Sequence, residues 1–293
     1  MKIASPPLPL KMAANLSKQH KVFNLVYDLS EDEVLSPKFL DRADYLRVHN
    51  EMHVDALQKQ IKPNGFGDTS SQILTHAYQS CESFYTAALA AVNQPGEAVV
   101  FSPSSGFHHA GYDYSGGYCT FNGLLVAACK LKVDGLVDTV TIIDGDGHYG
   151  DGTQDIIDKL GLHWVNHVSL DKSSVKGSSL VADRLLDEAF EGPKPDLVMY
   201  QAGADCHGAD PYNSGYLTDL EWKLRDAKVF MLCQEQDIPV VWNLAGGYNG
   251  IKTLNLHTST FVSALQVFYP ESSRLLFSPI GSSGTVEPSG QPL

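Results

Sequence analysis

The 293 residues of the chain, 43% of them hydrophobic and 19% charged, have the composition of a folded globular protein. This composition excludes a disordered chain, which has too few apolar side chains to form a core. With 21 Lys and Arg against 34 Asp and Glu, the formal net charge is −13, which argues against nucleic acid or an anionic membrane surface as the main partner.

Neither a membrane segment nor a disulfide framework is expected from the sequence. No apolar run reaches the ~18 residues that a membrane span requires, and the proline-containing first ten residues have no signal-peptide core. The five cysteines are few, odd in number and widely spaced, without a CxxC pair. We therefore predict a cytoplasmic protein without membrane attachment.

Two low-complexity ends enclose one predicted domain. Residues 1–20 contain several prolines and are predicted to form a flexible lead-in, and residues 280–293, rich in Gly, Ser and Pro, a flexible tail. Residues 21–279 contain no internal repeat and no linker-like stretch. We therefore predict that they fold as a single domain.

Apolar runs alternate along the chain with longer amphipathic stretches. The runs are rich in Val, Ile and aromatic residues and too short for buried helices, so we predict strands at 21–28, 98–102, 139–144, 164–170, 196–202 and 238–244. Apolar residues three or four apart predict helices at 70–91, 121–132, 154–160, 180–190 and 220–236. This alternation indicates an α/β fold whose mainly parallel sheet is covered by helices on both faces.

Polar, glycine-rich segments follow four of the predicted strands. They are SPSSGFHHA after 98–102, GDGHYGDG after 139–144, GADCHGADP near the end of 196–202 and AGGYN after 238–244. In an open α/β sheet, ligands bind outside the carboxyl ends of the strands. We therefore expect these four segments to meet at one edge of the sheet.

The first of the chemically informative patterns is Asp146-Gly-His148. Side chains two residues apart in an extended segment point to the same side, and carboxylate and imidazole are good ligands for zinc. Asp205 follows another strand and would be a third ligand, leaving the open position of a catalytic zinc site. Each pattern alone is more typical of an ordinary turn, and His207 is a rival ligand, but their joint position at strand ends favours a metal site.

Further side chains near these segments suit amide hydrolysis. The adjacent His108 and His109 could divide the base and acid roles, because a carboxylate partner orients an imidazole and raises its pKa. Asp144 and Asp151 are the candidate partners. The hydroxyl of Tyr248, after the last strand, is placed to stabilise an oxyanion.

Together these segments resemble the histone deacetylase family, including its bacterial deacetylase-like and acetylpolyamine amidohydrolase members. The matching segments are GFHHA (106–110), SGGYCTFN (115–122), IIDGDGHYGDG (142–152), VSL (168–170), QAGADCHGADP (201–211) and AGGYN (245–249). The resemblance implies the arginase/deacetylase fold, with 21–279 as the catalytic domain. It also implies a zinc-dependent amidohydrolase that removes an acyl group, expected to be acetyl, from an amine such as acyl-lysine or an acetylated polyamine.

The resemblance also implies two ion sites. One zinc ion per chain would be held by Asp146, His148 and Asp205. A structural monovalent cation, usually potassium in the family, would be bound near the segment that contains Asp144, Asp146, His148, Ser169 and Leu170.

Catalytic roles can be assigned from the resemblance position by position. It implies that His109 is the general base and is paired with Asp151. His108 would be the electrostatic or acid partner and would be paired with Asp144. Tyr248 would polarise the acyl carbonyl.

The substrate tunnel is where the sequence departs from the family. Gly117 and Tyr118 match the positions that line the acyl-lysine tunnel, but Tyr118 replaces the usual Phe. Segment 171–204 is short, and its first part, DKSSVKGSSLVADRL, has no aromatic residue to build the opposite wall. The usual His-Pro-x-Arg element is absent from the early chain. We therefore expect a more open site.

Two other functions remain open at this point. An arginase-like ureohydrolase with two manganese ions shares the fold, but Gly150 and the Cys206-His207 pair leave a second metal without carboxylates. A non-catalytic module would use the same tunnel to bind acylated lysine. Metal counting and turnover of an acyl-lysine substrate distinguish these functions from a zinc deacylase.

Overall fold

A parallel β-sheet forms the centre of the computed structural model, which describes residues 1–4, 14–27, 33–93, 99–212 and 214–271. In these ranges the sheet has seven strands in the order β2-β1-β3-β7-β6-β4-β5, and all neighbouring strands are parallel. The strands are β1 (Lys2–Ala4), β2 (Glu33–Leu35), β3 (Val99–Phe101), β4 (Val140–Asp144), β5 (Val165–Ser169), β6 (Leu197–Gln201) and β7 (Val240–Asn243).

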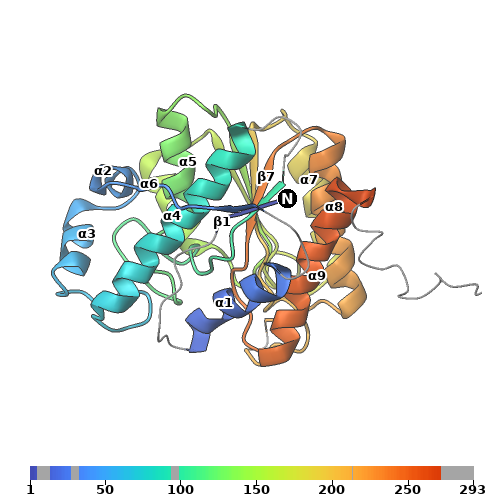
Figure 1. Cartoon of the computed structure of the whole chain (residues 1–293), viewed down its shortest axis with the longest axis horizontal. Coiled ribbons are helices and arrows are strands. Elements are labelled where there is room, and N and C mark those ends of the chain that lie inside the picture. The colour runs from blue at the N-terminus through green and yellow to red at the C-terminus, as the bar shows by residue number, and fades with distance from the viewer. Residues whose placement is uncertain (5–13, 28–32, 94–98, 213, 272–293) are drawn as a thin grey trace, which may run out of the picture.

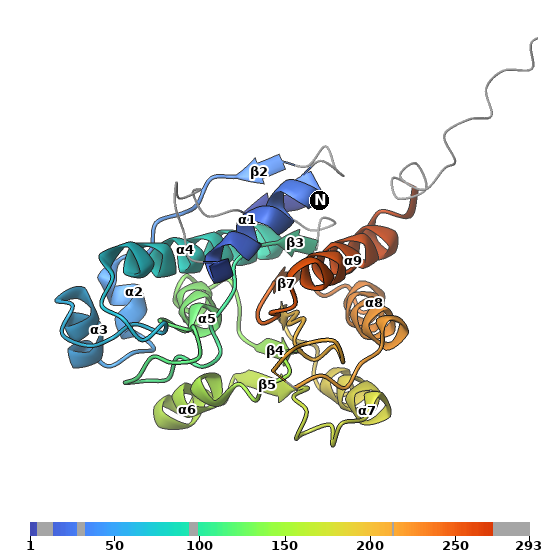
Figure 2. The same cartoon turned by 90° about the horizontal axis from the view of Figure 1, so that it is seen from below.

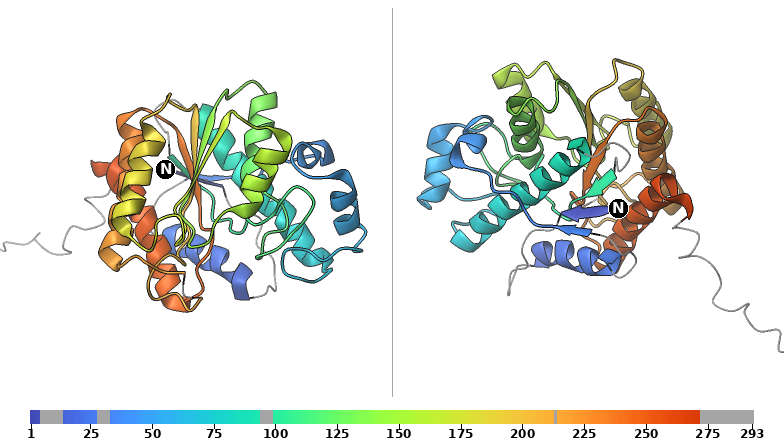
Figure 3. Two further views of the ribbon diagram at one scale, coloured as in Figure 1. Left: turned by 180° about the vertical axis from the view of Figure 1, so that it is seen from behind. Right: turned by 45° about the horizontal axis from the view of Figure 1, so that its top comes forward.

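Helices cover both faces of this sheet, as Figures 1 and 2 show. One face carries α2 (Arg42–Leu46), α3 (Glu51–Gln58), α4 (Ser71–Asn93), α5 (Gly123–Val133) and α6 (Asp151–Leu160). The other face carries α1 (Ala14–Tyr27), α7 (Ser179–Phe190), α8 (Asp219–Glu235) and α9 (Gly250–Phe268). The same layers are visible from behind in Figure 3. None of the helices in the described ranges is both long and apolar enough to cross a bilayer.

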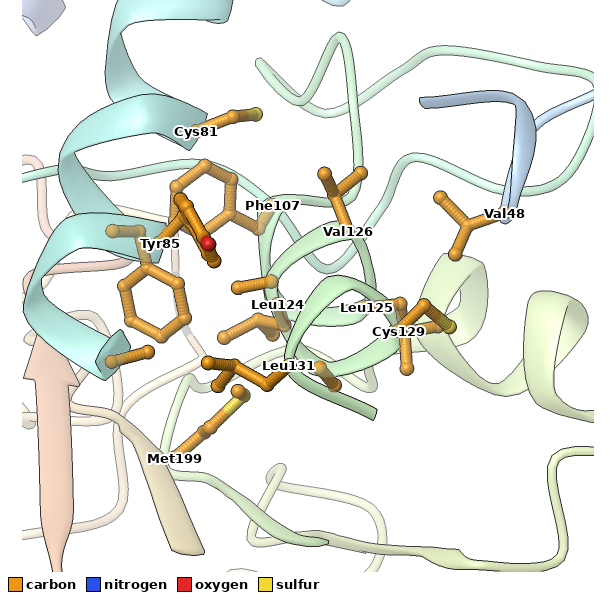
Figure 4. Close-up of a cluster of buried hydrophobic side chains, with 14 of the residues drawn as sticks. Val48, Cys81, Tyr85, Phe107, Leu124, Leu125, Val126, Cys129, Leu131 and Met199 are labelled. Carbon is orange, nitrogen blue, oxygen red and sulfur yellow. The ribbon is translucent and has the colours of Figure 1, made fainter. Parts of the chain in front are cut away.

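The strands supply apolar side chains to both faces, which explains their nearly continuous apolar sequences. In β4, Ile142 belongs to the core under α4 and α5, whereas Ile143 belongs to the core under α8 and α9. Met199 and Tyr200 alternate in the same way in β6. Figure 4 shows Phe107 and Met199 in the core under α4 and α5, where they pack around α5. Phe107 directly precedes the two predicted catalytic histidines, so this core supports their loop.

Five of the six predicted strands and all five predicted helices are confirmed, with ends shifted by a few residues; residue 98 of one strand lies outside the described residues. The strand predicted at 21–28 is wrong, because residues 21–27 belong to α1. Val22 and Val26, four residues apart, are fully buried while Leu25 is exposed. This spacing fits one helix face, and the β-branched and aromatic composition concealed it.

Several elements were not predicted, namely β1, β2, α2, α3 and α9. One of them, β1, and the helix α1 bear on the predicted lead-in: residues 2–4 form β1, between β2 and β3, and α1 begins at residue 14. The predicted boundary between the lead-in and the folded domain, at residue 20, therefore falls inside α1. The rest of the predicted lead-in, 5–13, and the predicted tail, 280–293, lie outside the described residues.

The carboxyl ends of the strands lie side by side and set the position of the loops that follow. Asp144, the last residue of β4, is in register with Ser169 of β5 and Gln201 of β6, and Gln201 is in register with Asn243 of β7. The chain therefore leaves these four strands at the same edge of the sheet.

Candidate active site

The three predicted metal-binding side chains come together at this edge. Nδ1 of His148 lies 2.9 Å from Oδ2 of Asp205 and 3.1 Å from Oδ1 of Asp146. One ligand atom from each of the three residues lies within 4.8 Å of the others. Both carboxylates are buried, whereas His148 is partly exposed. Segments 57 residues apart in the chain thus present their donor atoms to one point.

Backbone amides hold both carboxylates in place. The N–H of Gly147 donates to Oδ1 of Asp205 at 2.8 Å, and the N–H of Gly246 donates to Oδ2 of Asp146 at 2.8 Å. A Cβ atom on Gly246 would collide with both carboxylates. The AGGYN segment therefore needs glycine here, because the backbone itself passes against the donor cluster.

The two buried carboxylates of this cluster need a positive charge beside them. Burial, followed by the neighbouring Asp146, raises the pKa of Asp205 to about 7. Hydrogen bonds to the two carboxylates raise the pKa of His148 to about 10, so an imidazolium balances the carboxylates in this arrangement. Two carboxylates and one imidazole fit a divalent ion that keeps open coordination positions, because buried charges need a counter-charge or a metal.

The two adjacent histidines each have a separate carboxylate partner. Nδ1 of His108 lies 2.8 Å from Oδ2 of Asp144, and Nδ1 of His109 lies 2.5 Å from Oδ1 of Asp151. The ring centroids of the two histidines are 4.0 Å apart. The Asp144 side chain is fully buried, whereas that of Asp151 is 55% exposed. The two imidazoles therefore sit in different surroundings, which is the condition for different acid–base roles.

Buried polar groups surround the inner pair, His108 and Asp144. Burial lowers the pKa of His108, but the charges of Asp144 and Asp146 outweigh it and raise this pKa to about 9. The amide of Gln201 donates to Oδ1 of Asp144 at 3.1 Å, and Nε2 of His167 lies 3.8 Å from Oδ2. His108 is thus held as a cation by a carboxylate that is itself anchored to the sheet.

Tyr248 is fixed by the loop that follows β6. Its backbone N–H donates to Oδ2 of Asp210 at 3.0 Å, and the N–H of Tyr212 donates to the other oxygen, Oδ1, also at 3.0 Å. The rings of Tyr212 and Tyr248 meet edge to face, with centroids 4.6 Å apart. Burial raises the pKa of Tyr248 far above its usual value, so its hydroxyl stays protonated and can donate a hydrogen bond.

One cavity of about 370 Å³ contains these groups. Its lining includes Asp146 and His148 of the three-residue cluster, the adjacent His108 and His109, and Gly117, Tyr118 and Tyr248. A Cβ atom on Gly117 would collide with the His109 ring, and Gly117 also has a φ of 51°, so this wall position requires glycine. The next residue, Tyr118, also lines the cavity and is 39% exposed.

The predicted cation-site residues also lie at the strand ends. The N–H of Leu170 donates to the backbone oxygen of Asp144 at 2.7 Å, and the Leu170 oxygen accepts from the Tyr216 hydroxyl at 2.7 Å. The Ser169 hydroxyl donates to Asp171. Ser169 and Leu170 are thus adjacent to Asp144, whose carboxylate faces His108.

One part of the site comes from α1, which no pattern in the sequence predicts. Nζ of Lys18 donates to the backbone oxygen of Ala245 at 2.5 Å and lines the cavity. Burial lowers the pKa of Lys18 to about 8, against the opposing effect of Asp205 and Asp146. Asp210 was missed too. No spacing signal identifies either residue, because each reaches the site only through tertiary packing.

The comparison with known proteins agrees with this arrangement. The chain matches the histone deacetylase domain model over residues 10–170 and 164–265. It therefore belongs to the histone deacetylase family, and its parallel sheet with flanking helices is the α/β fold of that family.

Individual relatives cover different parts of the chain. Histone deacetylase 2 of Arabidopsis thaliana is 25% identical over 75% of this chain and 64% of its own length. A probable deacetylase of Archaeoglobus fulgidus is 25% identical over 76% of this chain and 71% of its own length. The acetylpolyamine amidohydrolase of Mycoplana ramosa is 48% identical, but over only 18% of this chain and 16% of its own. An uncharacterised protein of Picosynechococcus is matched over 54% of its length, so the chain spans half to two thirds of several relatives.

Proposed function

We propose that the protein is a zinc-dependent amidohydrolase that removes an acyl group, acetyl in the simplest case, from an amine such as acyl-lysine or an acetylated polyamine. The observation that carries this proposal is the cluster of Asp146, His148 and Asp205. Asp146 and His148 line a cavity together with Tyr248 and with the two histidines that are paired with aspartates. The names of the relatives, which include deacetylases and acetylpolyamine amidohydrolases, support an acetylated amine as substrate.

In this proposal Asp146, His148 and Asp205 hold the zinc ion. The chemistry that zinc supplies when bound in such a site is polarisation of a carbonyl and a lowered pKa of water. Three protein ligands leave room for both, as in other catalytic zinc sites. A potassium ion near Asp144, Ser169 and Leu170 is part of the same proposal.

The acid–base work falls to the two histidines. Nδ1–H of His109 donates to Asp151, which leaves Nε2 to accept the proton of the attacking water. His108 is cationic at neutral pH because of Asp144 and Asp146, and its charge favours the negative tetrahedral intermediate. A protonated histidine then gives a proton to the departing amine, so that the products are a free amine and a carboxylic acid.

Tyr248 completes this mechanism. Its hydroxyl donates to the acyl oxygen, and this hydrogen bond strengthens as negative charge develops there. Gly117 and Tyr118 flank the amine side of the substrate at the opening of the cavity. We also propose a cytoplasmic location, supported by the five cysteines, all of which are free and buried.

The proposal is tested with purified protein, its metal content and a set of acylated amines. We expect about one zinc per chain and hydrolysis of acetyl-lysine peptides or acetylputrescine, with turnover lost in Tyr248→Phe. Two manganese ions and urea release from a guanidino substrate would instead identify an arginase-like enzyme. Binding of acyl-lysine without any turnover would identify a binding module.

A further inference from the structure

The helix α1 contributes two lysines to the cavity that the proposed mechanism does not use. Lys18 and Lys21 both line the cavity and lie about one helical turn apart. The helix packs beside α9, as Figure 1 shows, and the α9 residue Ile251 lines the same cavity. One wall of the cavity is therefore cationic, although the chain as a whole has a net charge of −13.

The exposed lining residues mark the place where the cavity opens to solvent. They are Lys21, Gly117, Tyr118, Gly250 and Ile251. At the other end of the cavity, the lining residues His108 and Asp146 are buried. Lys21 therefore lies at the opening. Lys18 lies farther in, because its Nζ donates to the backbone oxygen of Ala245, which is a buried lining residue.

Neither lysine has a carboxylate partner within the described ranges. The only hydrogen bond of the Lys18 ammonium there goes to a backbone oxygen, and Lys21 forms no ion pair with Asp or Glu. Among the described residues, Asp146 is the only acidic side chain that lines the cavity, and in the proposed enzyme it holds the zinc ion. The cavity therefore offers no free carboxylate to a cationic group of a substrate, but it offers two ammonium groups to an anionic one.

We propose that Lys21, supported by Lys18, is the subsite for an anionic group on the amine part of the substrate, so that acylated amines carrying a carboxylate are hydrolysed in preference to acetylated polyamines. This inference rests on the proposed function and narrows its substrate class. The amine part of a protein substrate is a whole polypeptide, so it must extend from the buried cluster through the opening and past Lys21. A carboxylate there forms a charge-assisted hydrogen bond, whereas the free ammonium group of a polyamine meets a like charge.

Three acetylated amines of equal length test this preference on the full-length, zinc-loaded protein. Their far ends are a carboxylate, a methyl group and an ammonium group, in 6-acetamidohexanoate, N-hexylacetamide and N-acetylcadaverine. We expect kcat/KM to fall about fivefold at each step in this order, the effect of one exposed ion pair and then of one repulsive pair. Dissociation constants for the Tyr248→Phe protein, measured by calorimetry, should follow the same order.

The results separate failure of the subsite from failure of the proposed function. If N-hexylacetamide is hydrolysed and N-acetylcadaverine is hydrolysed equally fast or faster, the subsite alone is overturned. If neither these amines nor an acetyl-lysine peptide is hydrolysed, the proposed function is overturned and the subsite with it.

Variants connect the preference to Lys21. Lys21→Met should bring the ratio of carboxylate to methyl hydrolysis towards one, Lys21→Glu should make the ammonium substrate the preferred one, and Lys21→Arg should retain the original order. Lys223→Met is the matched control, because Lys223 is also an exposed helical lysine but does not line the cavity. A ratio that is unchanged in Lys21→Met, or that falls equally in Lys223→Met, would overturn the assignment.

Lysine substrates show which carboxylate occupies the subsite. In acetyl-lysine the amide and the α-carboxylate have the same spacing as the amide and carboxylate of 6-acetamidohexanoate. Faster hydrolysis of a peptide with a free C-terminal acetyl-lysine than of its C-terminal amide would identify that α-carboxylate as the anionic group. Faster hydrolysis of a peptide with Glu beside the acetyl-lysine than of one with Gln there would identify a neighbouring side chain. No difference within either pair would overturn the subsite for lysine substrates.

Discussion

Asp210 offers the most specific test of how the site is assembled, because one carboxylate holds two tyrosines. Its oxygens accept the backbone N–H groups of Tyr248 and Tyr212, each at 3.0 Å, and its side chain is largely buried. Asp210→Asn keeps the shape but converts one acceptor into a donor, which cannot face an N–H. We expect the loop of Tyr248 to lose its anchor without loss of the metal cluster.

The expected size of the effect follows from the bonds involved. Loss of one hydrogen bond to a charged group costs about 1.5–3 kcal/mol, and removal of an oxyanion donor lowers kcat about 10²- to 10³-fold. Because Asp210 acts only through the position of Tyr248, Asp210→Asn should lower kcat about 10- to 100-fold, with little change in KM or zinc content.

A double-mutant cycle with Tyr248→Phe separates an effect of Asp210 on the position of the Tyr248 hydroxyl from a general disturbance of the fold. If Asp210 acts through the Tyr248 hydroxyl, Asp210→Asn should have almost no further effect on kcat once that hydroxyl is gone. The matched control is Asp196→Asn, since Asp196 also accepts two backbone N–H groups, from Asp138 and Thr139, but next to the amino ends of β4 and β6. Additive losses in the cycle, or an equal loss of kcat in the control, would refute this reasoning.

Three further predictions concern metal binding, stability and pH. Gly246→Ala should weaken zinc binding sharply, because the added Cβ would collide with the buried carboxylates of Asp146 and Asp205. An unchanged zinc affinity in a titration would contradict the close contact of the Gly246 backbone with these carboxylates. Arg225→Met should lower the free energy of unfolding by about 3–5 kcal/mol in urea, since it leaves the buried Asp226 carboxylate without its guanidinium, and a loss below 1 kcal/mol would argue against that pairing. Burial lowers the pKa of His49 to about 4, and its Nε2 accepts from the N–H of Asn122. Between pH 6.5 and 4 the unfolded chain therefore binds more protons than the folded chain. As the pH is lowered through this window, the free energy of unfolding should decrease by about 1.4 kcal/mol per pH unit from this group, and His49→Gln should flatten the slope.

The sequence predicted the centre of the fold better than its edges. Strands such as β4 and β6 are buried on both faces, so their sequences are continuous apolar runs that leave little ambiguity. In contrast, β1 and β2 have three residues each, too few for a periodic pattern. The helix α9 was missed because Thr and Ser residues interrupt its apolar pattern and are poor helix formers.

The residues of the site were predictable where they follow strands. Asp146 and Asp205 lie two and four residues after the ends of β4 and β6, and parallel strands present such residues at one edge. Lys18 and Asp210 carry no comparable signal. Lys18 reaches the cavity because α1 packs beside the loop after β7, and a local sequence pattern does not encode this packing.

Anomalous diffraction at the zinc absorption edge, from crystals grown with zinc, tests the central claim most directly. We expect one strong peak in each chain, between the two carboxylates and the imidazole of Asp146, Asp205 and His148, and no such peak in Asp205→Ala crystals. A peak at another place, or zinc retained at this position in Asp205→Ala, would contradict it.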